Sequence, residues 1–153
     1  MIEKPHRLPP DLYRGHRAVA FTCCMHNRTP YFISQTNVTP IENILRTVLS
    51  KHSSNAHVYL FMPDHLHLLL EGTNTQTDLY KCIRDFKQKS GFWLSKNTAV
   101  RWQKDFYDHI LREDEPIEKH VLYILKNPER KNLVENWTLY PYKGSTLYDF
   151  AQW

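Results

Sequence analysis

The strongest constraint on the fold lies in residues 61–70, which read Phe-Met-Pro-Asp-His-Leu-His-Leu-Leu-Leu. Because strand side chains alternate between two faces, His65 and His67 point to the same face, and the leucines around them indicate burial. A buried polar group without a hydrogen bond costs kilocalories, so both imidazoles need partners. Ordinary hydrogen bonds would meet this need, and so would one metal ion bound by both histidines.

The flanking segments predict further strands and helices. Apolar spacing predicts strands at 17–24, 56–61, 65–71 and 102–112, and helices at 39–50, 78–95 and 116–127. Thr39, Pro40 and Glu42 fit a capping box in which Thr39 is the N-cap of its helix. Residues 62–64 form the turn of an antiparallel hairpin. This order predicts an α+β fold, a ferredoxin-like sandwich with helices packed on a central antiparallel sheet.

Composition is typical of a single globular domain. The chain of 153 residues is 41% apolar, and we expect one domain over 1–153 with a basic arm at 1–16 and an irregular aromatic segment at 133–153. We find no apolar run that would span a bilayer and no signal peptide. The three cysteines are odd in number, which argues against a disulfide framework and favours a reducing cytoplasm. A net charge of +4 permits nucleic-acid binding without requiring it.

A second candidate group lies on the helix predicted at 116–127. Tyr123 and Asn127 are four residues apart, so they share one helix face. The amide oxygen could be a third metal ligand while the phenol attacks a substrate. Two imidazoles, one amide oxygen and open positions suit Mg²⁺ or Mn²⁺, and Zn²⁺ or Ni²⁺ could also bind. The alternative is that Tyr123 is a core residue and that Asn127 and Pro128 only end the helix.

These segments together resemble a known family. Residues 62–69 are similar to the His-hydrophobic-His motif of the HUH endonucleases. Residues 123–134 resemble the C-terminal signature of REP-associated tyrosine transposases, which are single-tyrosine relatives of the single-strand insertion-sequence transposases. Residues 14–16, 106–112, 137 and 140–144 match as well, so the resemblance covers about 13–145 in the family's order. Glu129 and Asn132 depart from the family pattern, at positions away from the expected chemistry.

The resemblance implies a mechanism on single-stranded DNA that bears a hairpin. Tyr123 would attack a backbone phosphorus and leave a 5′-phosphotyrosine and a free 3′-hydroxyl. Mg²⁺ or Mn²⁺, held by His65, His67 and Asn127, would polarise a phosphate oxygen. Relatives act as homodimers that exchange tyrosine helices or as monomers, and both remain open here. The resemblance also implies a bacterial, cytoplasmic, nucleoid-associated protein.

Candidate DNA contacts are basic, polar and aromatic. They are Arg14, His16, Lys81, Arg84, Lys87, Gln88, Arg112, Lys126, Arg130, Lys131, Trp137 and Tyr142. The cations would bind phosphates, and the aromatic rings, with Tyr140, would stack on unpaired bases. The alternatives are a solvated helix face and aromatic rings that seal a core. Two other functions stay open: a non-catalytic or domesticated DNA-binding protein of the same fold, and a replication-initiator-like nickase.

Overall fold

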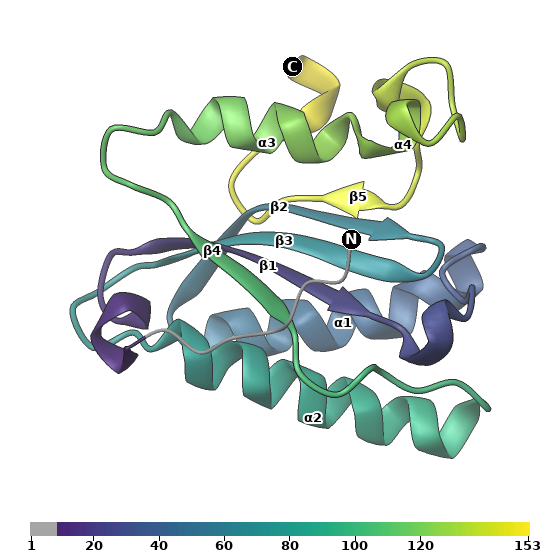
Figure 1. Ribbon diagram of the computed structural model, residues 1–153, viewed down its shortest axis with the longest axis horizontal. Helices are drawn as coiled ribbons and strands as arrows, with labels where there is room; N and C mark the ends of the chain where they lie inside the picture. The colour runs from purple at the N-terminus through teal and green to yellow at the C-terminus, as the bar shows by residue number, and fades with distance from the viewer. Residues whose placement is uncertain (1–8) are drawn as a thin grey trace.

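A five-stranded antiparallel sheet is the centre of the computed structural model, which describes residues 9–153 (Figure 1). The strands are β1 (Ala18–Cys24), β2 (Ser54–Met62), β3 (His65–Gly72), β4 (Tyr107–Ile110) and β5 (Lys143–Gly144). Their order across the sheet is β4-β1-β3-β2-β5. The first four strands have the order and connections of a ferredoxin-like fold, and β5 extends the sheet beyond β2. The predicted fold class is confirmed.

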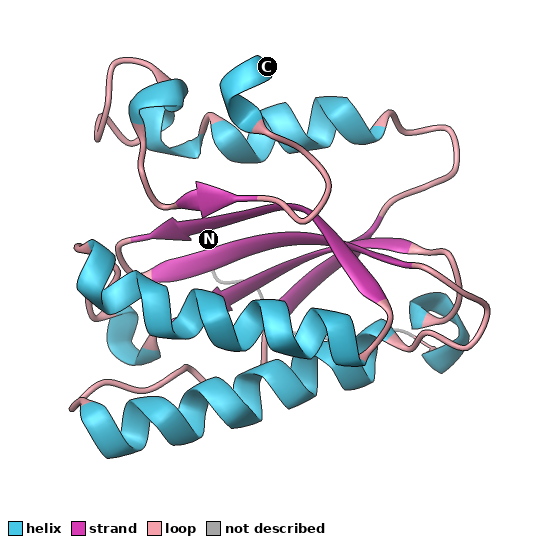
Figure 2. Cartoon of the chain, turned by 180° about the vertical axis from the view of Figure 1, so that it is seen from behind, coloured by secondary structure: helices cyan, strands magenta, loops and turns pink. Residues whose placement is uncertain are grey.

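Helices cover both faces of this sheet (Figures 1 and 2). The α-helices are α1 (Gln35–Lys51), α2 (Leu79–Asn97), α3 (Ile117–Leu125) and α4 (Asn127–Arg130). Short 3-10 turns lie at Pro10–Tyr13, His26–Arg28, Trp137–Leu139 and Phe150–Gln152. The long helices α1 and α2 pack side by side on one face, and α3 and α4 lie on the other. In the part of the chain that the structure describes, no helix has the length and apolar character to cross a membrane.

The strand β3 lies in the middle of the sheet, which explains its apolar sequence. It pairs with β1 on one side and with β2 on the other. Leu66, Leu68 and Leu70 belong to the core beneath α1 and α2, whereas Leu69 belongs to the core beneath α3. The β2–β3 hairpin closes where Met62 pairs with His65, as the sequence predicted.

The start of α1 differs from the prediction. The N-cap is Ser34, whose hydroxyl accepts a hydrogen bond from the Asn37 backbone amide at 3.2 Å. Thr39, the predicted N-cap, lies inside the helix, and so does Pro40. The predicted capping box is therefore wrong, because Ser34 caps an earlier turn and Val38 from that turn is buried in the core.

Residues 9–16 and 133–153 contain more packed structure than the sequence suggested. Residues 1–8 of the predicted arm lie outside the described residues, but Tyr13 is buried and its hydroxyl donates to Asp108 at 2.6 Å. The segment 133–153 was expected to be irregular. It contains β5 and two 3-10 turns, because Trp137 and Phe150 are buried in the core beneath α3. All three cysteines are free, and all three are buried.

Candidate metal and tyrosine site beside α3

The two histidines of β3 face each other on the α3 side of the sheet. The Nε2 atoms of His65 and His67 are 3.0 Å apart, and the rings meet edge to face with centroids 4.6 Å apart. Alternation along β3 places both rings on the face opposite Leu66 and Leu68. The sequence predicted this shared face, and the structure shows that the ring nitrogens converge on one point.

The outer ring nitrogens are held by second partners. His65 Nδ1 donates to Asp64 Oδ1 at 2.6 Å, and His67 Nδ1 lies 3.2 Å from Thr22 Oγ1 on β1. Arg28 in turn donates through Nε to Asp64 Oδ2 at 3.0 Å and through Nη1 to Cys24 Sγ at 3.3 Å. These contacts fix the ring orientations, which is the usual role of partners around metal-binding histidines. No local sequence pattern indicated this role for Asp64, Thr22 and Arg28.

Electrostatics keep both rings neutral. Burial lowers the pKa of His67 to about 3, and nearby positive charges add to the effect. Burial also lowers the pKa of His65, although the Asp64 carboxylate opposes it. Burial raises the pKa of Asp64, but hydrogen bonds from His65 and Arg28 outweigh that effect, so its pKa lies below the ordinary value. Neutral imidazole is the form that binds a metal ion.

The chemistry of the pair fits a bound cation. Because ionised Asp64 only accepts hydrogen bonds, His65 carries its proton on Nδ1 and turns the lone pair of Nε2 toward His67. A cation between the two Nε2 atoms would satisfy both lone pairs. Among the described residues, no group of three His, Cys, Asp or Glu side chains is arranged to hold a metal ion. An amide oxygen, a substrate oxygen or water would serve as a third ligand beside the two imidazoles.

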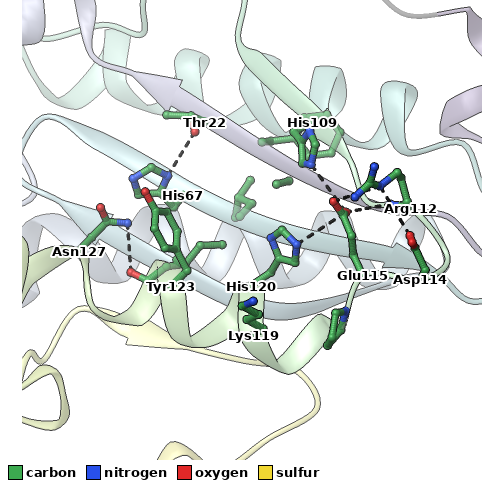
Figure 3. Close-up of a pocket in the computed structure, with 15 residues that line it drawn as sticks. Thr22, His67, His109, Arg112, Asp114, Glu115, Lys119, His120, Tyr123 and Asn127 are labelled. Carbon is green, nitrogen blue, oxygen red and sulfur yellow. Dashed lines mark hydrogen bonds and ion pairs between the residues drawn. The ribbon is translucent and has the colours of Figure 1, made fainter.

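A cleft of about 760 Å³ lies between α3 and the β1–β4 side of the sheet. Val121, Ile124 and Leu125 of α3 pack mainly with residues of β2, and residues 20–22 of β1 line the cleft beside them. His67 lines this cleft, and so do Tyr123 of α3 and Asn127 at the start of α4 (Figure 3). The structure thus brings together groups that are more than fifty residues apart in the chain.

Tyr123 is not a core residue, so that alternative from the sequence is wrong. Its side chain is 65% exposed, whereas Val121 and Leu125 on the same helix are fully buried. Asn127 does help to end α3, since its amide nitrogen donates to the Ile124 carbonyl at 3.1 Å. That hydrogen bond directs the amide oxygen away from the helix (Figure 3). The oxygen is thus available to a ligand in the cleft.

The far end of the cleft holds a cluster of charged and imidazole side chains, which the sequence predicted only in part. Glu115 Oε2 lies 3.8 Å from His109 Nε2 and 3.6 Å from His120 Nε2, and Glu115 Oε1 lies 3.5 Å from Arg112 Nε (Figure 3). Arg112 was predicted as a possible DNA contact. Glu115 and His120 were not, because their contact with β4 depends on how the 111–116 connection folds.

The predicted DNA contacts separate into two groups in space. Lys81, Arg84, Lys87 and Gln88 belong to α2, on the face of the sheet opposite the cleft. Lys87 is engaged within the protein, because its ammonium donates to the carbonyls of Gln103 and Asp105. The other predicted cations around the site are Arg112, Lys126, Arg130 and Lys131, all on the α3 side.

Residues near the N-terminus lie away from Tyr123. Arg14 Nε is 4.0 Å from Asp78 Oδ2, next to the start of α2. His16 lines a separate hollow that it shares with Arg112 and Glu113. Any contact of Arg14 or His16 with DNA would therefore lie outside the cleft beside α3.

Burial changes the interpretation of the C-terminal aromatic residues. Trp137 is 8% exposed and Tyr140 is 5% exposed, and both belong to the core beneath α3. The Tyr140 hydroxyl donates to the Phe61 carbonyl at 2.5 Å. Tyr142 is half-buried, and its hydroxyl donates to the Ile33 carbonyl at 3.3 Å. In this conformation Trp137 and Tyr140 seal the core, which was the alternative to base stacking.

Comparisons with known proteins agree with the resemblance seen in the motifs. A family model described as "Transposase IS200 like" matches residues 16–127. A putative REP-associated tyrosine transposase of Haemophilus influenzae is 22% identical over an alignment of 139 residues, and the match covers 81% of this chain and 77% of the relative. That match confirms the predicted resemblance.

Solved structures show the same fold. A REP-associated tyrosine transposase bound to a REP hairpin superposes with a TM-score of 0.76 at 20% identity, over 95% of this chain and 83% of that one. A putative transposase of Deinococcus radiodurans superposes with a TM-score of 0.53 at 15% identity, over 83% of this chain and 97% of that one.

Proposed function

The chain belongs to the family of IS200-like transposases, and we propose that it cleaves and rejoins single-stranded DNA through a covalent bond to Tyr123. One observation carries this proposal: an exposed phenol and a converging pair of neutral imidazoles line or border the same cleft. A nucleophile beside a site for a cation is the arrangement that phosphoryl transfer requires.

The proposed step forms one bond and breaks another. The phenolic oxygen of Tyr123 bonds to phosphorus, and the bond from phosphorus to the 3′ oxygen breaks. The phenolic proton passes to water, and the 3′ oxygen takes up a proton as it leaves. The protein then holds the 5′ phosphate on Tyr123, and a later 3′-hydroxyl can reverse the step because one phosphodiester replaces another.

The residues around the cleft have different proposed roles. His65, His67 and Asn127 would hold Mg²⁺ or Mn²⁺, which when bound polarises a phosphate oxygen and neutralises charge that develops on it. Asp64 and Thr22 keep the two imidazoles turned toward the shared point. Cations on the α3 side, such as Lys126 and Lys131, would attract the DNA backbone.

The substrate that we propose is single-stranded DNA with a hairpin. Support comes from the structural neighbour, a REP-associated tyrosine transposase bound to a REP hairpin. The α2 face, with Lys81 and Arg84, offers cations for a duplex stem away from the cleft, while the cleft takes an unpaired strand. Base stacking by Trp137 is not part of this proposal, because its ring is buried.

We further propose that one chain completes the site. Tyr123 lines the same cleft as His67 of its own chain, so no exchange of α3 between protomers is needed. Mixing His67→Gln with Tyr123→Phe protein tests this arrangement. Catalysis in cis predicts that the mixture stays inactive, whereas exchanged helices would assemble one intact site and restore covalent attachment.

The function itself is tested by a covalent-attachment assay. Labelled single-stranded hairpin DNA is incubated with the protein and Mn²⁺ or Mg²⁺, and protein-bound label is sought on a denaturing gel. We expect an adduct with the unaltered protein, none with Tyr123→Phe, and none with His65→Ala. Tight binding without an adduct under either metal would instead favour a non-catalytic DNA-binding protein.

A further inference from the structure

Arg130 of α4 contacts both the ring and the backbone of Tyr123. The Arg130 Cζ atom lies 4.1 Å from the centroid of the Tyr123 ring. Its Nη2 atom also donates to the backbone carbonyl of Tyr123 at 2.6 Å. A guanidinium at this distance from an aromatic ring is attracted to the ring face, and it stacks there more effectively than an ammonium.

The break in the helix makes this contact possible. α3 ends at Leu125, Lys126 is a turn residue, and α4 begins at Asn127 with Pro128 next. The last carbonyls of α3 then lack ordinary helical partners, and side chains from α4 supply them. The Asn127 side-chain amide donates a hydrogen bond to the Ile124 carbonyl, and the Arg130 guanidinium donates one to the Tyr123 carbonyl. Arg130 is thereby held across the ring.

Tyr123 needs such a constraint. At 65% exposure the side chain is enclosed by few protein atoms, and exposed side chains change rotamer within nanoseconds. A nucleophile reacts efficiently only when it is held close to the attacked atom and in line with it. We propose that Arg130 is a positioning residue, which holds the Tyr123 ring in the rotamer that presents the phenol to the cleft. This inference rests on the proposed role of Tyr123 as the nucleophile.

The sequence suggested a different role for Arg130, namely a contact with a DNA phosphate. The two roles predict different measurements. Loss of a phosphate contact weakens DNA binding and reduces its dependence on salt. Loss of a positioning contact slows attachment at saturating DNA and leaves the affinity unchanged.

The first test compares Arg130→Gln with a matched control. Lys96→Ala is that control, because Lys96 also places a cation over an exposed aromatic ring, that of Phe92 at 5.4 Å, but on α2. We expect the single-turnover rate of adduct formation at saturating hairpin DNA to fall by about 5- to 30-fold in Arg130→Gln. The dissociation constant for the DNA should stay within about twofold, and Lys96→Ala should match the unaltered protein.

A second measurement needs no DNA and no activity. Tyrosines are replaced with 3-fluorotyrosine, and the fluorine resonance of residue 123 is identified by its loss in Tyr123→Phe. Arg130→Gln should shift that resonance, because it removes the cation from the ring, and Lys96→Ala should not. Arg130→Lys should restore the rate only in part, since it keeps the charge but not the planar stack.

The outcomes separate this inference from the proposed function. An unmoved fluorine resonance in Arg130→Gln, or a weaker DNA affinity with an unchanged rate, would overturn the positioning role while Tyr123 remains the nucleophile. An adduct that persists in Tyr123→Phe would instead overturn the proposed function, whatever the fluorine spectrum shows.

Discussion

The two faces of the sheet carry different kinds of contact, although the same strand supplies both. Toward α1 and α2, β3 presents Leu66, Leu68 and Leu70 to a large apolar core. Toward α3 it presents His65 and His67, which border a cleft, and only Leu69 joins the smaller core there. Alternation along one strand therefore separates stability from chemistry, one residue at a time.

The two faces also differ in how completely they are packed and in the titratable side chains that they contain. The α1–α2 face buries apolar surface almost completely, which is the main favourable contribution to folding. On the α3 face such packing is interrupted near β1 and β4, where the cleft lies. It also contains two imidazoles whose pKa values lie below the ordinary value because of burial. We expect substitutions on the two faces to act on different measurements.

The largest effect is expected at His67. His67→Gln keeps a polar side chain of similar size but removes one of the two converging ring nitrogens. Adduct formation should fall by at least about 100-fold, because charge stabilisation by a metal is worth several kcal/mol. The free energy of unfolding, measured by urea titration, should change by less than about 1 kcal/mol. An active His67→Gln variant would remove the proposed distinction between the faces.

The matching substitution on the other face is Leu68→Ala. Leu68 is fully buried beneath α1 and α2. Its truncation should lower the free energy of unfolding by about 2–5 kcal/mol, measured by urea titration. The fraction that stays folded should form the adduct at the ordinary rate. A specific loss of activity in folded Leu68→Ala protein would show that the faces are coupled.

A smaller effect is expected at the partners of the histidines. Asp64→Ala and Thr22→Val each remove the group that orients one imidazole. Each should weaken Mn²⁺ binding by about 10- to 100-fold in isothermal titration calorimetry, as is usual for such partners. Unchanged Mn²⁺ affinity in both variants would contradict the role given to these contacts.

The smallest effect is expected at Phe92. This residue lies on α2 but is 66% exposed, so it contributes little to the apolar core of its face. Phe92→Ser should change the free energy of unfolding by no more than about 0.5 kcal/mol and leave adduct formation unaltered. A larger change would show that the outer surface of α2 has a role that the core does not explain.

Much of the fold followed from local patterns in the sequence. The two-residue periodicity of 65–71 placed both histidines on one face. The four-residue spacing of Tyr123 and Asn127 placed them on one side of the predicted helix, and both line the cleft although Asn127 begins α4. The start of α1 was misjudged because two segments can each cap a helix. The choice of Ser34 over Thr39 depends on Val38 packing into the core, and local sequence does not show that packing.

Other features depend on contacts between distant segments. Arg28 reaches Asp64 across 36 residues, and nothing near either residue indicates the pairing. Trp137 was expected to contact DNA but is buried, because β5 and the final turn bring the C-terminal segment against α3. The contact of Arg130 with the Tyr123 ring requires the helix to break at Lys126. The sequence predicted only that a helix ends near this position.

The central claim is that Tyr123 receives the DNA strand beside the histidine pair. The most direct test is to digest the protein–DNA adduct with a protease and a nuclease and to identify the modified residue by mass spectrometry. The account predicts that the phosphate is carried by Tyr123 in the peptide from α3, and that this modification requires a divalent metal ion. A nucleotide on another residue, or modification of Tyr123 at an equal rate in the presence of excess chelator, would contradict it.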